Sequence, residues 1–203
     1  NGKTEMWYVI DAEEGASLVY GFRHKVTPEL LKKAIKTGTL DKHLHKIKVR
    51  KGDVFYVPAG TVHGIGAGIL IAEIQESSNV TYRVYDYNRV DKNGQKRELH
   101  FDKAVQVMDM GVVAENQQHH KIVKHYPGCS RELLCRCQYF EVERIQVTKA
   151  VSFSVMDQSF QILMCLDGYG QVKTMDDEIK PIMFSKGETV FIPAKIGRCM
   201  VIG

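Results

Sequence analysis

Short runs of β-branched and aromatic residues recur along the chain and predict a protein built mainly from strands. In the first half, turns rich in glycine or carrying Asp/Asn-Gly pairs separate these runs. From Leu133 onward, apolar and polar residues again alternate with the two-residue period of a strand. We therefore expect an all-β fold. The strands predicted in the first half are residues 6–10, 18–22, 47–49, 54–57, 69–74 and 81–90.

Two helical patterns interrupt the strands. Thr27, followed by proline and glutamate, is a favourable N-cap, and Gly38 ends the helix after a single apolar stripe. This pattern predicts a small helical insert near residues 27–46, between strands. A second apolar stripe over residues 101–110, with Asp102 as its cap, predicts a helix that bridges the two halves of the chain.

A ten-residue segment occurs twice and divides the chain into two similar halves. Residues 51–60 return as residues 186–195 at an offset of 135. Both copies are typical of a turn, a buried strand and a bend that ends at a proline. Upstream, Glu5 with an aspartate six residues later matches Gln161 with its own aspartate at the same spacing.

The duplication predicts two domains. A 203-residue chain with 44% apolar residues can bury two cores. We expect antiparallel β-sandwiches over residues 1–112 and 113–203, with the linker near 111–125. The copies differ five residues after the shared proline, where the first has His63 and the second has Arg198. Because a guanidinium stays protonated and cannot serve as a metal ligand, we expect a metal site in the first domain and a structural, metal-free second domain.

Composition narrows the class of partner. The net charge of +4 comes without long Lys/Arg runs, which fits a small anionic ligand better than nucleic acid. No apolar run approaches the roughly 20 residues of a membrane span, and no signal segment opens the chain. The five cysteines lack the spacing of a zinc site, so we expect reduced thiols in a cytoplasmic protein. These features predict a soluble protein that binds neither nucleic acid nor membrane, and they do not indicate an oligomeric state.

The segment Gly52-x5-Pro58-x-Gly60-x2-His63 has a physical logic for ligand binding. The first glycine turns the chain, a strand follows, and Pro-Ala-Gly bends it so that His63 points to the end of a barrel, where ligands bind. This spacing resembles the second motif of the cupin superfamily, although Ala67 lies near the place of the motif's trailing asparagine.

Three motifs in the same order extend the resemblance: KTEMWY at residues 3–8, PAGTVH at 58–63 and NVTYRVYDY at 79–87. Together they resemble type I mannose-6-phosphate isomerase in its short bacterial form, over nearly the whole chain. The resemblance implies two cupin jelly rolls and an enzyme that interconverts mannose 6-phosphate and fructose 6-phosphate through an enediolate. It further implies one zinc ion per chain, in the first domain, and a small sugar phosphate as the partner.

Carried over position by position, the resemblance implies roles for five residues. Glu5 and His63 resemble zinc ligands of the family. Its active-site Lys, Glu and Arg correspond to Lys3, Glu73 and Arg83. Arg83 would stabilise the enediolate or the phosphate, Lys3 would act as a second cation or proton relay, and Glu73 would transfer a proton or orient a hydroxyl. We expect Glu5 and His63 to reach one metal ion although 58 residues separate them.

Simpler interpretations stay open for each residue. Taken alone, a strand glutamate such as Glu5 or Glu73 is usually a solvated surface group, and His63 is a hydrogen-bonded histidine at a bend. Arg83 has the alternative of a cross-strand ion pair. The remaining histidines have no partner at ligand spacing and are interpreted as surface residues. For the whole chain, the alternatives are a non-catalytic sugar-binding or structural cupin fragment, or another metal-dependent cupin such as a dioxygenase, which would need an iron-type facial triad that the sequence does not show.

The chain itself is expected to be a piece of a longer protein. It starts at Asn1 with strand-like residues close behind, and the strand at 69–74 has no counterpart after Gly203 in the second copy. The Gln-x-His ligand pair of the family precedes the position of Lys3, so we expect that pair roughly 20 residues before Glu5. With two ligands, these 203 residues are expected to bind zinc weakly and to isomerise poorly.

Overall fold

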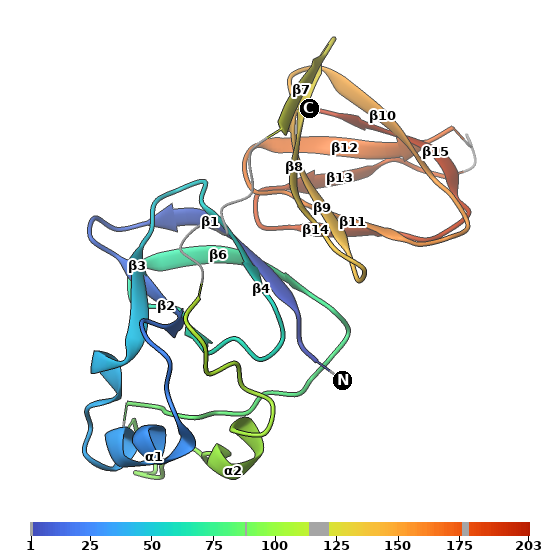
Figure 1. Ribbon diagram of the computed structural model, residues 1–203. Coiled ribbons are helices and arrows are strands. Elements are labelled where there is room, and N and C mark those ends of the chain that lie inside the picture. The colour runs from blue at the N-terminus through green and yellow to red at the C-terminus, as the bar shows by residue number, and fades with distance from the viewer. Residues whose placement is uncertain (1, 88, 114–121, 176–178) are drawn as a thin grey trace. The chain divides into compact units, whose positions relative to one another are not determined.

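The computed structural model describes residues 2–87, 89–113, 122–175 and 179–203 of the chain. Strands dominate it (Figure 1), which confirms the predicted all-β class. Among these described residues, no helix is long and apolar enough to cross a membrane. The elements in chain order are β1 (Glu5–Ala12), β2 (Ser17–Phe22), α1 (Pro28–Lys36), η1 (Leu40–Lys42), β3 (Leu44–Lys48), β4 (Val54–Val57), β5 (His63–Gly64), β6 (Ile69–Gln75), α2 (Phe101–Ala104), β7 (Ile122–Tyr126), β8 (Cys129–Arg136), β9 (Glu141–Val147), β10 (Ala150–Val155), β11 (Gln161–Met164), β12 (Tyr169–Thr174), β13 (Ile182–Ser185), β14 (Thr189–Ile192) and β15 (Gly197–Ile202).

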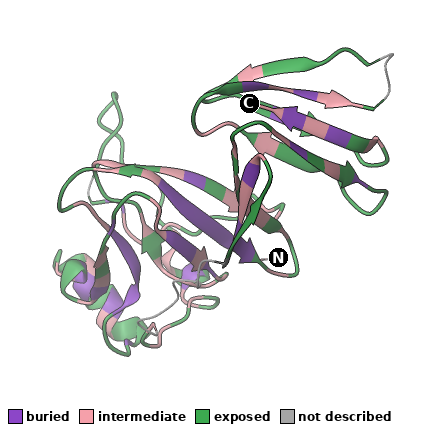
Figure 2. Ribbon diagram, turned by 90° about the horizontal axis from the view of Figure 1, so that it is seen from above, coloured by how far each residue is buried: buried purple, intermediate pink, exposed green. Residues whose placement is uncertain are grey.

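The chain divides into two compact units. The first comprises Asn1–His120 and Cys135–Glu141, and the second comprises Lys121–Leu134 and Val142–Gly203. Buried residues lie mainly along the strands (Figure 2). The predicted linker near 111–125 lies largely outside the described residues, and its last part is wrong, because β7 already begins within it.

Two antiparallel three-stranded sheets form the framework of the first unit, in the orders β4-β1-β6 and β3-β2-β5. β1 is the central strand of its sheet, and Trp7 pairs with Phe55 of β4 on one side and with Glu73 of β6 on the other. Residues 5–9 of β1 are all buried, so both faces of this central strand pack inside the unit. The core cluster between the sheets contains Trp7, Val9, Leu18, Tyr20, Val49, Phe55 and Val57.

The helical insert forms as predicted. The Thr27 side chain accepts a hydrogen bond from the Leu30 N–H at 3.3 Å and so caps the N-terminus of α1. Gly38 follows the helix with a φ of +67°, in the left-handed region that glycine adopts without a steric penalty. Leu31 on the apolar stripe is fully buried and belongs to one core cluster with Phe22 of β2 and Leu44 of β3. Packing against these strands holds the helix in place.

The described residues of the segment 81–90 do not form the predicted strand. The Arg83 N–H donates to the His100 ring at 3.2 Å, and the His100 N–H donates to the Arg83 carbonyl at 2.7 Å. A local turn follows, where Tyr87 has a left-handed φ of +52°. The described backbone of this segment bonds to His100 and to a local turn, and Val90 forms one isolated antiparallel bridge with Lys96. These contacts do not extend into a ladder with a neighbouring strand.

The second predicted helix, over residues 101–110, is shorter than expected. α2 ends at Ala104, whose carbonyl accepts the N–H of Val107 at 3.1 Å and that of Met108 at 2.9 Å in a final turn. Asp102 is not the cap, because His100 holds that position and makes no side-chain capping bond. Without a cap the helix stays a single turn, and it belongs to the first unit instead of bridging the two halves.

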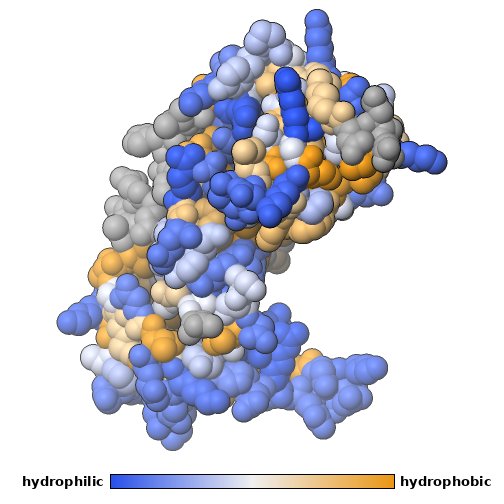
Figure 3. Space-filling view, turned by 90° about the vertical axis from the view of Figure 1, so that its right-hand side faces the viewer, coloured by the Kyte–Doolittle hydropathy of each residue, from blue (hydrophilic) through white to orange (hydrophobic). Residues whose placement is uncertain are grey.

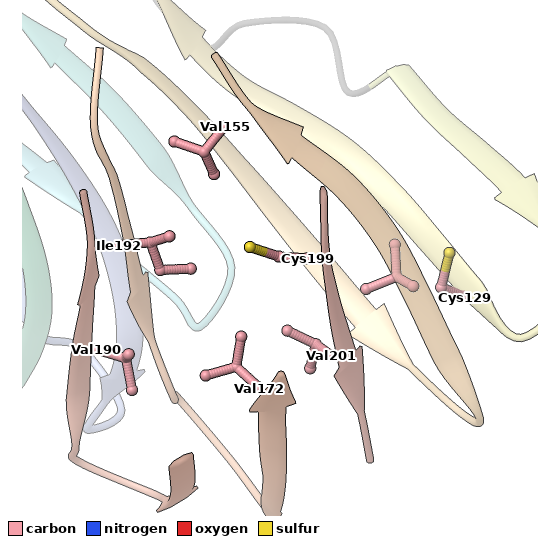
Figure 4. Packing of buried hydrophobic residues seen from close by; sticks show 8 residues of the cluster. Cys129, Val155, Val172, Val190, Ile192, Cys199 and Val201 are labelled. Atoms are coloured by element: carbon pink, nitrogen blue, oxygen red, sulfur yellow. The ribbon is translucent and has the colours of Figure 1, made fainter. Parts of the chain in front are cut away.

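The second unit contains a four-stranded sheet, β10-β15-β12-β13, a two-stranded sheet, β11-β14, and the sheet β7-β8-β9. Its core is a cluster of apolar side chains: Cys129, Val151, Val155, Val172, Val190, Ile192, Cys199 and Val201. In Figure 4, Val172, Ile192 and Cys199 point toward one another from different strands. Cys199 is fully buried, and burial raises the pKa of its thiol. It therefore acts as a packing residue.

The second unit also buries a carboxylate. Glu132 is 2% exposed and lies 2.6 Å from Arg144 Nη2. This ion-pair contact lacks hydrogen-bond geometry, and within the described residues neither oxygen of Glu132 has a hydrogen-bond partner. Compensation of this buried charge therefore depends on Arg144.

Strand register confirms that the two units repeat one element. β1 pairs with β4 so that Glu5 is opposite Val57. β11 pairs with β14 so that Gln161 is opposite Ile192. In the sequence repeat, Gln161 is the counterpart of Glu5 and Ile192 is the counterpart of Val57. The duplicated segments therefore adopt the same antiparallel pairing.

The backbone at the bends of the duplicated segments also agrees. Gly52 and Gly187, at the turns before β4 and β14, have φ of +90° and +89°. Gly60 has a φ of +92°, and Lys195 at the matching position has a φ of +68°. A non-glycine residue in this region costs about 1–2 kcal/mol, so the repeat keeps its backbone shape even where the glycine is lost.

The molecular face in Figure 3 is mainly hydrophilic, with hydrophobic patches among the charged residues. Exposed ion pairs such as Lys46–Asp41, 3.0 Å apart, mix the two signs of charge. This mixture agrees with the modest net charge of +4.

Candidate active site in the first unit

One face of the first strand carries a cluster of polar side chains. Successive residues of an extended chain point to opposite sides, so Lys3, Glu5 and Trp7 share one face. Glu73 in β6 is the direct partner of Trp7 and lies on that same face. Glu5 is 1% exposed, whereas the Glu73 side chain is 34% exposed. The cluster therefore runs from a buried carboxylate to one that solvent and ligands can reach.

His63 joins the cluster from the other sheet. It lies in β5, opposite Tyr20 of β2, and its Nε2 is 3.7 Å from Glu5 Oε2. This distance confirms that Glu5 and His63 converge. The preceding bend needs glycine, because Gly60 has a φ of +92° and a Cβ there would meet the Val107 carbonyl oxygen at 2.7 Å.

Hydrogen bonding fixes which ring nitrogen of His63 carries hydrogen. Nδ1 lies 2.8 Å from the Thr61 carbonyl oxygen, which can only accept, so Nδ1 is the donor. In the neutral ring, Nε2 then presents its lone pair toward the Glu5 carboxylate. These two acceptors are 3.7 Å apart, and a cation bound by both would be stabilised there.

Lys3 supplies the positive charge of the cluster. Its ammonium donates to Glu5 Oε1 and, at 3.3 Å, to Glu73 Oε1. Burial opposes the charge on Lys3, but the hydrogen bond and charge of Glu5, followed by those of Glu73, outweigh it and raise the pKa of the ammonium. Lys3 therefore stays charged and links the two carboxylates.

Trp7 is a site residue that the sequence pattern did not reveal. Its indole N–H donates to Glu5 Oε2 at 3.0 Å and to Glu73 Oε2 at 3.1 Å. The rings of Trp7 and His63 meet edge to face, with centroids 5.2 Å apart. The available signal was strand alternation, since Trp7 follows Glu5 by two residues. Its apolar character pointed to the core, where most of the ring does lie.

The structure does not bring Arg83 into this cluster. Its backbone position is set by the two bonds to His100, and within the described residues its guanidinium makes no hydrogen bond or ion pair with the clustered side chains. The hydrogen bond from Arg89 is the main reason that the pKa of Asp86 is lowered, and the charge of Arg83 adds to it. The predicted site residues that converge are Lys3, Glu5, His63 and Glu73.

The interpretation of the other histidines as surface residues holds for His24, which is exposed, and its ring contacts that of the half-buried His43. His24 Nδ1 donates to the Lys25 carbonyl oxygen at 3.0 Å, which leaves its Nε2 to accept from His43 Nδ1, also at 3.0 Å. η1 and the loop after β2 bring these rings together, and sequence spacing does not show this. His119 and His120 lie outside the described residues.

Known proteins are similar to this chain over nearly its whole length. Residues 131–203 match the family model described as mannose-6-phosphate isomerase, cupin domain. Mannose-6-phosphate isomerase ManA of Bacillus subtilis is 36% identical over 203 residues, which cover 100% of this chain and 62% of that protein. The mannose-6-phosphate isomerase of Streptococcus mutans is 36% identical over 195 residues, which cover 96% of this chain and 59% of that protein. These matches confirm that the chain is similar to mannose-6-phosphate isomerase, as its motifs indicate.

Two solved structures share its fold. The mannose 6-phosphate isomerase from Bacillus subtilis superposes with a TM-score of 0.80 at 32% identity, over 98% of this chain and 64% of that one. A mutant of phosphomannose isomerase from Salmonella typhimurium gives a TM-score of 0.63 at 12% identity, over 100% of this chain and 66% of that one, and supports the fold alone. The chain thus spans about three fifths of the length of the mannose-6-phosphate isomerases that it matches in sequence.

Glu5 and His63 have the chemistry and spacing of metal ligands. Two atoms that bind one zinc ion tetrahedrally at about 2.1 Å lie about 3.4 Å apart, and Glu5 Oε2 and His63 Nε2 are 3.7 Å apart. The bond from His63 Nδ1 to the Thr61 carbonyl is the orienting contact that metal-binding histidines usually make. Within the described residues, however, no group of three His, Cys, Asp or Glu side chains is arranged to hold an ion.

The second unit carries different chemistry at the matching positions. Gln161 is opposite Ile192, as Glu5 is opposite Val57, but Gln161 is exposed. Arg198 stands at the position of His63, in β15. That the second unit holds no metal stays a prediction, which these two replacements support.

Proposed function

We propose that this chain provides the catalytic cluster of a metal-dependent aldose–ketose isomerase that interconverts mannose 6-phosphate and fructose 6-phosphate. The observation that carries the proposal is the convergence of a buried carboxylate, an imidazole, an ammonium and an accessible second carboxylate: Glu5, His63, Lys3 and Glu73. The names of the relatives supply the reaction and the substrate. Such a reaction needs a Lewis acid, a proton-transfer group and fixed cations. The cluster contains candidate ligands for the first, Glu73 for the second and Lys3 for the third.

We propose that Glu5 and His63 hold the metal ion, one zinc per chain. Bound there, the ion would supply positive charge to the sugar oxygens while negative charge develops on them. The chain prepares both ligands in advance. Trp7 and Lys3 each bind one oxygen of the Glu5 carboxylate, and the Thr61 carbonyl orients the His63 ring.

Glu73 is the proposed proton-transfer group. Conversion of the aldose to the ketose removes the C2 hydrogen as a proton and delivers a proton to C1, through an enediolate. The carboxylate of Glu73 would accept the first proton and, as a carboxylic acid, return it to the neighbouring carbon, while the hydroxyl hydrogen on O2 passes to O1. Its side chain is 34% exposed and is held by Lys3 at 3.3 Å and by Trp7 at 3.1 Å, so it is both accessible and oriented. Glu5, at 1% exposure, lacks this access.

The two cations are proposed to act at different ends of the substrate. Lys3 lies between the carboxylates and would stabilise the enediolate oxygens beside Glu73. Arg83 makes no contact with the clustered side chains within the described residues. Because the phosphate on C6 is four carbons from C2, this separation favours the phosphate as the partner of Arg83 over the enediolate.

A second candidate function is sugar-phosphate binding without turnover. The observation that favours it is the ligand count, since a catalytic zinc site ordinarily takes three protein ligands and the described residues supply Glu5 and His63. The two functions predict the same ligand and differ in turnover.

A coupled assay distinguishes them. Mannose 6-phosphate conversion is followed as NADPH through phosphoglucose isomerase and glucose-6-phosphate dehydrogenase, with zinc added. The assay uses the 203-residue chain and a chimera in which the chain replaces the matching 62% of Bacillus subtilis ManA. We expect turnover in the chimera that a chelator abolishes and zinc restores, with at least a hundredfold loss in Glu5→Gln and no loss in Gln161→Ala, its exposed counterpart. Substrate binding without turnover in a zinc-loaded chimera would support the second candidate, and turnover that survives chelation would refute the metal-dependent one.

A further inference from the structure

Trp7 is the only tryptophan of the chain, and its polar edge points into the candidate site. The ring is buried in the core cluster of the first unit, opposite Phe55 of β4. A buried indole needs one acceptor for its single N–H. Here the N–H faces two, Glu5 Oε2 at 3.0 Å and Glu73 Oε2 at 3.1 Å. The N–H therefore contacts one acceptor more than the indole requires, and both acceptors are carboxylates of the candidate site.

The four side chains form a closed ring of contacts. Lys3 binds Oε1 of Glu5 and Oε1 of Glu73, and Trp7 binds Oε2 of both. Each carboxylate is therefore held at both of its oxygens, and neither can rotate without breaking a bond to Lys3 or Trp7. The oxygen of Glu5 that Trp7 binds is also the one that faces His63 Nε2.

The two donors in this ring differ in rigidity. Lys3 is a long, flexible side chain, partly exposed and outside the regular strand. Trp7 is fixed by the strand, by core packing and by the edge contact with His63. A rigid side chain that donates to a metal-binding carboxylate acts as an outer-shell support, and loss of such support typically lowers metal affinity 10–100-fold.

We propose that Trp7 is a positioning residue, which holds the Glu5 carboxylate toward His63 and ties Glu73 to it through one shared N–H. This inference rests on the proposed function, because it takes Glu5 and His63 as the metal ligands. Trp7 does not touch the substrate in this scheme. It sets the affinity for the metal by fixing the orientation of Glu5, and it fixes the separation between the metal site and the proton-transfer group.

The test removes the indole N–H and keeps an aromatic ring at position 7. Trp7→Phe retains an aromatic side chain against His63 but donates to neither carboxylate. Phe55→Leu is the matched control, because Phe55 is the buried strand partner of Trp7 in the same cluster and has no polar atom. Zinc affinity is measured on these variants in the chimera with Bacillus subtilis ManA, by competition with a chromophoric chelator, and thermal midpoints are measured without metal. We expect Trp7→Phe to raise the zinc Kd 10–100-fold and Phe55→Leu to change it less than threefold, although both lower the thermal midpoint.

A spectroscopic measurement on the wild-type chain supplies an independent readout. Zinc should change the emission of the sole tryptophan, since the indole N–H binds the proposed ligand Glu5, and Glu5→Gln should abolish that change. Equal zinc affinities for Trp7→Phe and Phe55→Leu, in chains whose wild type does bind zinc, would overturn the positioning role alone. Absence of zinc binding in the wild type would overturn the metal site of the proposed function together with this inference.

Discussion

Replacement of Lys3 by methionine tests whether one ammonium holds the carboxylate cluster together. Glu5 Oε2 and Glu73 Oε2 accept the same Trp7 N–H at 3.0 and 3.1 Å, so these oxygens lie no more than about 6 Å apart. Two unit charges at that separation repel by about 3 kcal/mol at an effective dielectric constant of about 20. Because the Glu73 side chain is 34% exposed, solvent screening reduces the repulsion to about 1–3 kcal/mol.

We expect Lys3→Met to lower the free energy of unfolding by this amount, about 1–3 kcal/mol, in urea denaturation followed by circular dichroism. Lys3→Arg keeps the charge and should retain most of the stability. Lys46→Met is the matched control, because the Lys46–Asp41 pair has side chains that are 47% and 50% exposed and should contribute less than about 1 kcal/mol. Zinc bound by Glu5 and His63 should restore more stability to Lys3→Met than to the wild type, since it supplies the missing positive charge. Equal unfolding free energies for Lys3→Met and the wild type would refute this reasoning.

Three further predictions concern other parts of the chain. Arg144→Met should destabilise the second unit by about 3 kcal/mol in urea denaturation, because it leaves the buried Glu132 uncompensated. Adding Glu132→Leu should recover most of that loss. If the unfolding free energies lost in the two single variants simply add in the double variant, the two residues are not coupled. Thr27→Ala should lower the free energy of unfolding by about 1 kcal/mol through loss of the α1 cap, and an unchanged thermal midpoint would show that the cap is dispensable. Burial raises the pKa of the Cys135 thiol to about 11. At pH 8 about one thiol in a thousand is then ionised, so alkylation of Cys135 by iodoacetamide should be slow. The alkylation rate should rise about tenfold per pH unit as the pH approaches 11. Peptide mass spectrometry measures that rate, and labelling of Cys135 at the rate of a free cysteine would exclude the buried environment.

The elements that sequence patterns predicted correctly are those decided by local chemistry. α1 formed where Thr27 could cap it and Gly38 could end it, and the strands around the duplicated segments formed where glycine turns bracket a short apolar run. The segment 81–90 has the same alternation, yet its backbone bonds to His100 and turns at Tyr87. Alternation states that a segment is able to form a strand, whereas a ladder also needs a neighbouring strand with free donors and acceptors. Whether such a neighbour is present depends on the tertiary structure, which a local sequence pattern does not contain.

The candidate site shows the same division. Strand alternation places Lys3 and Glu5 on one face. The cupin-like spacing that ends at His63 predicted that this residue reaches Glu5, and it does so from the other sheet. The partnership of Trp7 with both carboxylates depends on the orientation of one N–H, which core packing sets. The position of Arg83 depends on the fold of a segment that is not a strand. The sequence therefore predicts the residues whose placement follows from chain periodicity, and it misses those whose placement follows from packing.

The duplication separates what the fold requires from what the site requires. Both units keep the antiparallel strand pair and the left-handed bend, and the second unit keeps that bend with Lys195, at a steric cost, where the first has Gly60. Backbone shape is thus retained where the glycine that favours it is gone, which indicates that the packing of the unit enforces the bend. The chemistry is different in the two units, because Gln161 is exposed where Glu5 is 1% exposed. A buried carboxylate persists only when cations and donors compensate its charge. In the first unit the cluster of Lys3 and Trp7 provides that compensation, so the duplicated fold supplies the scaffold and the compensating side chains supply the site.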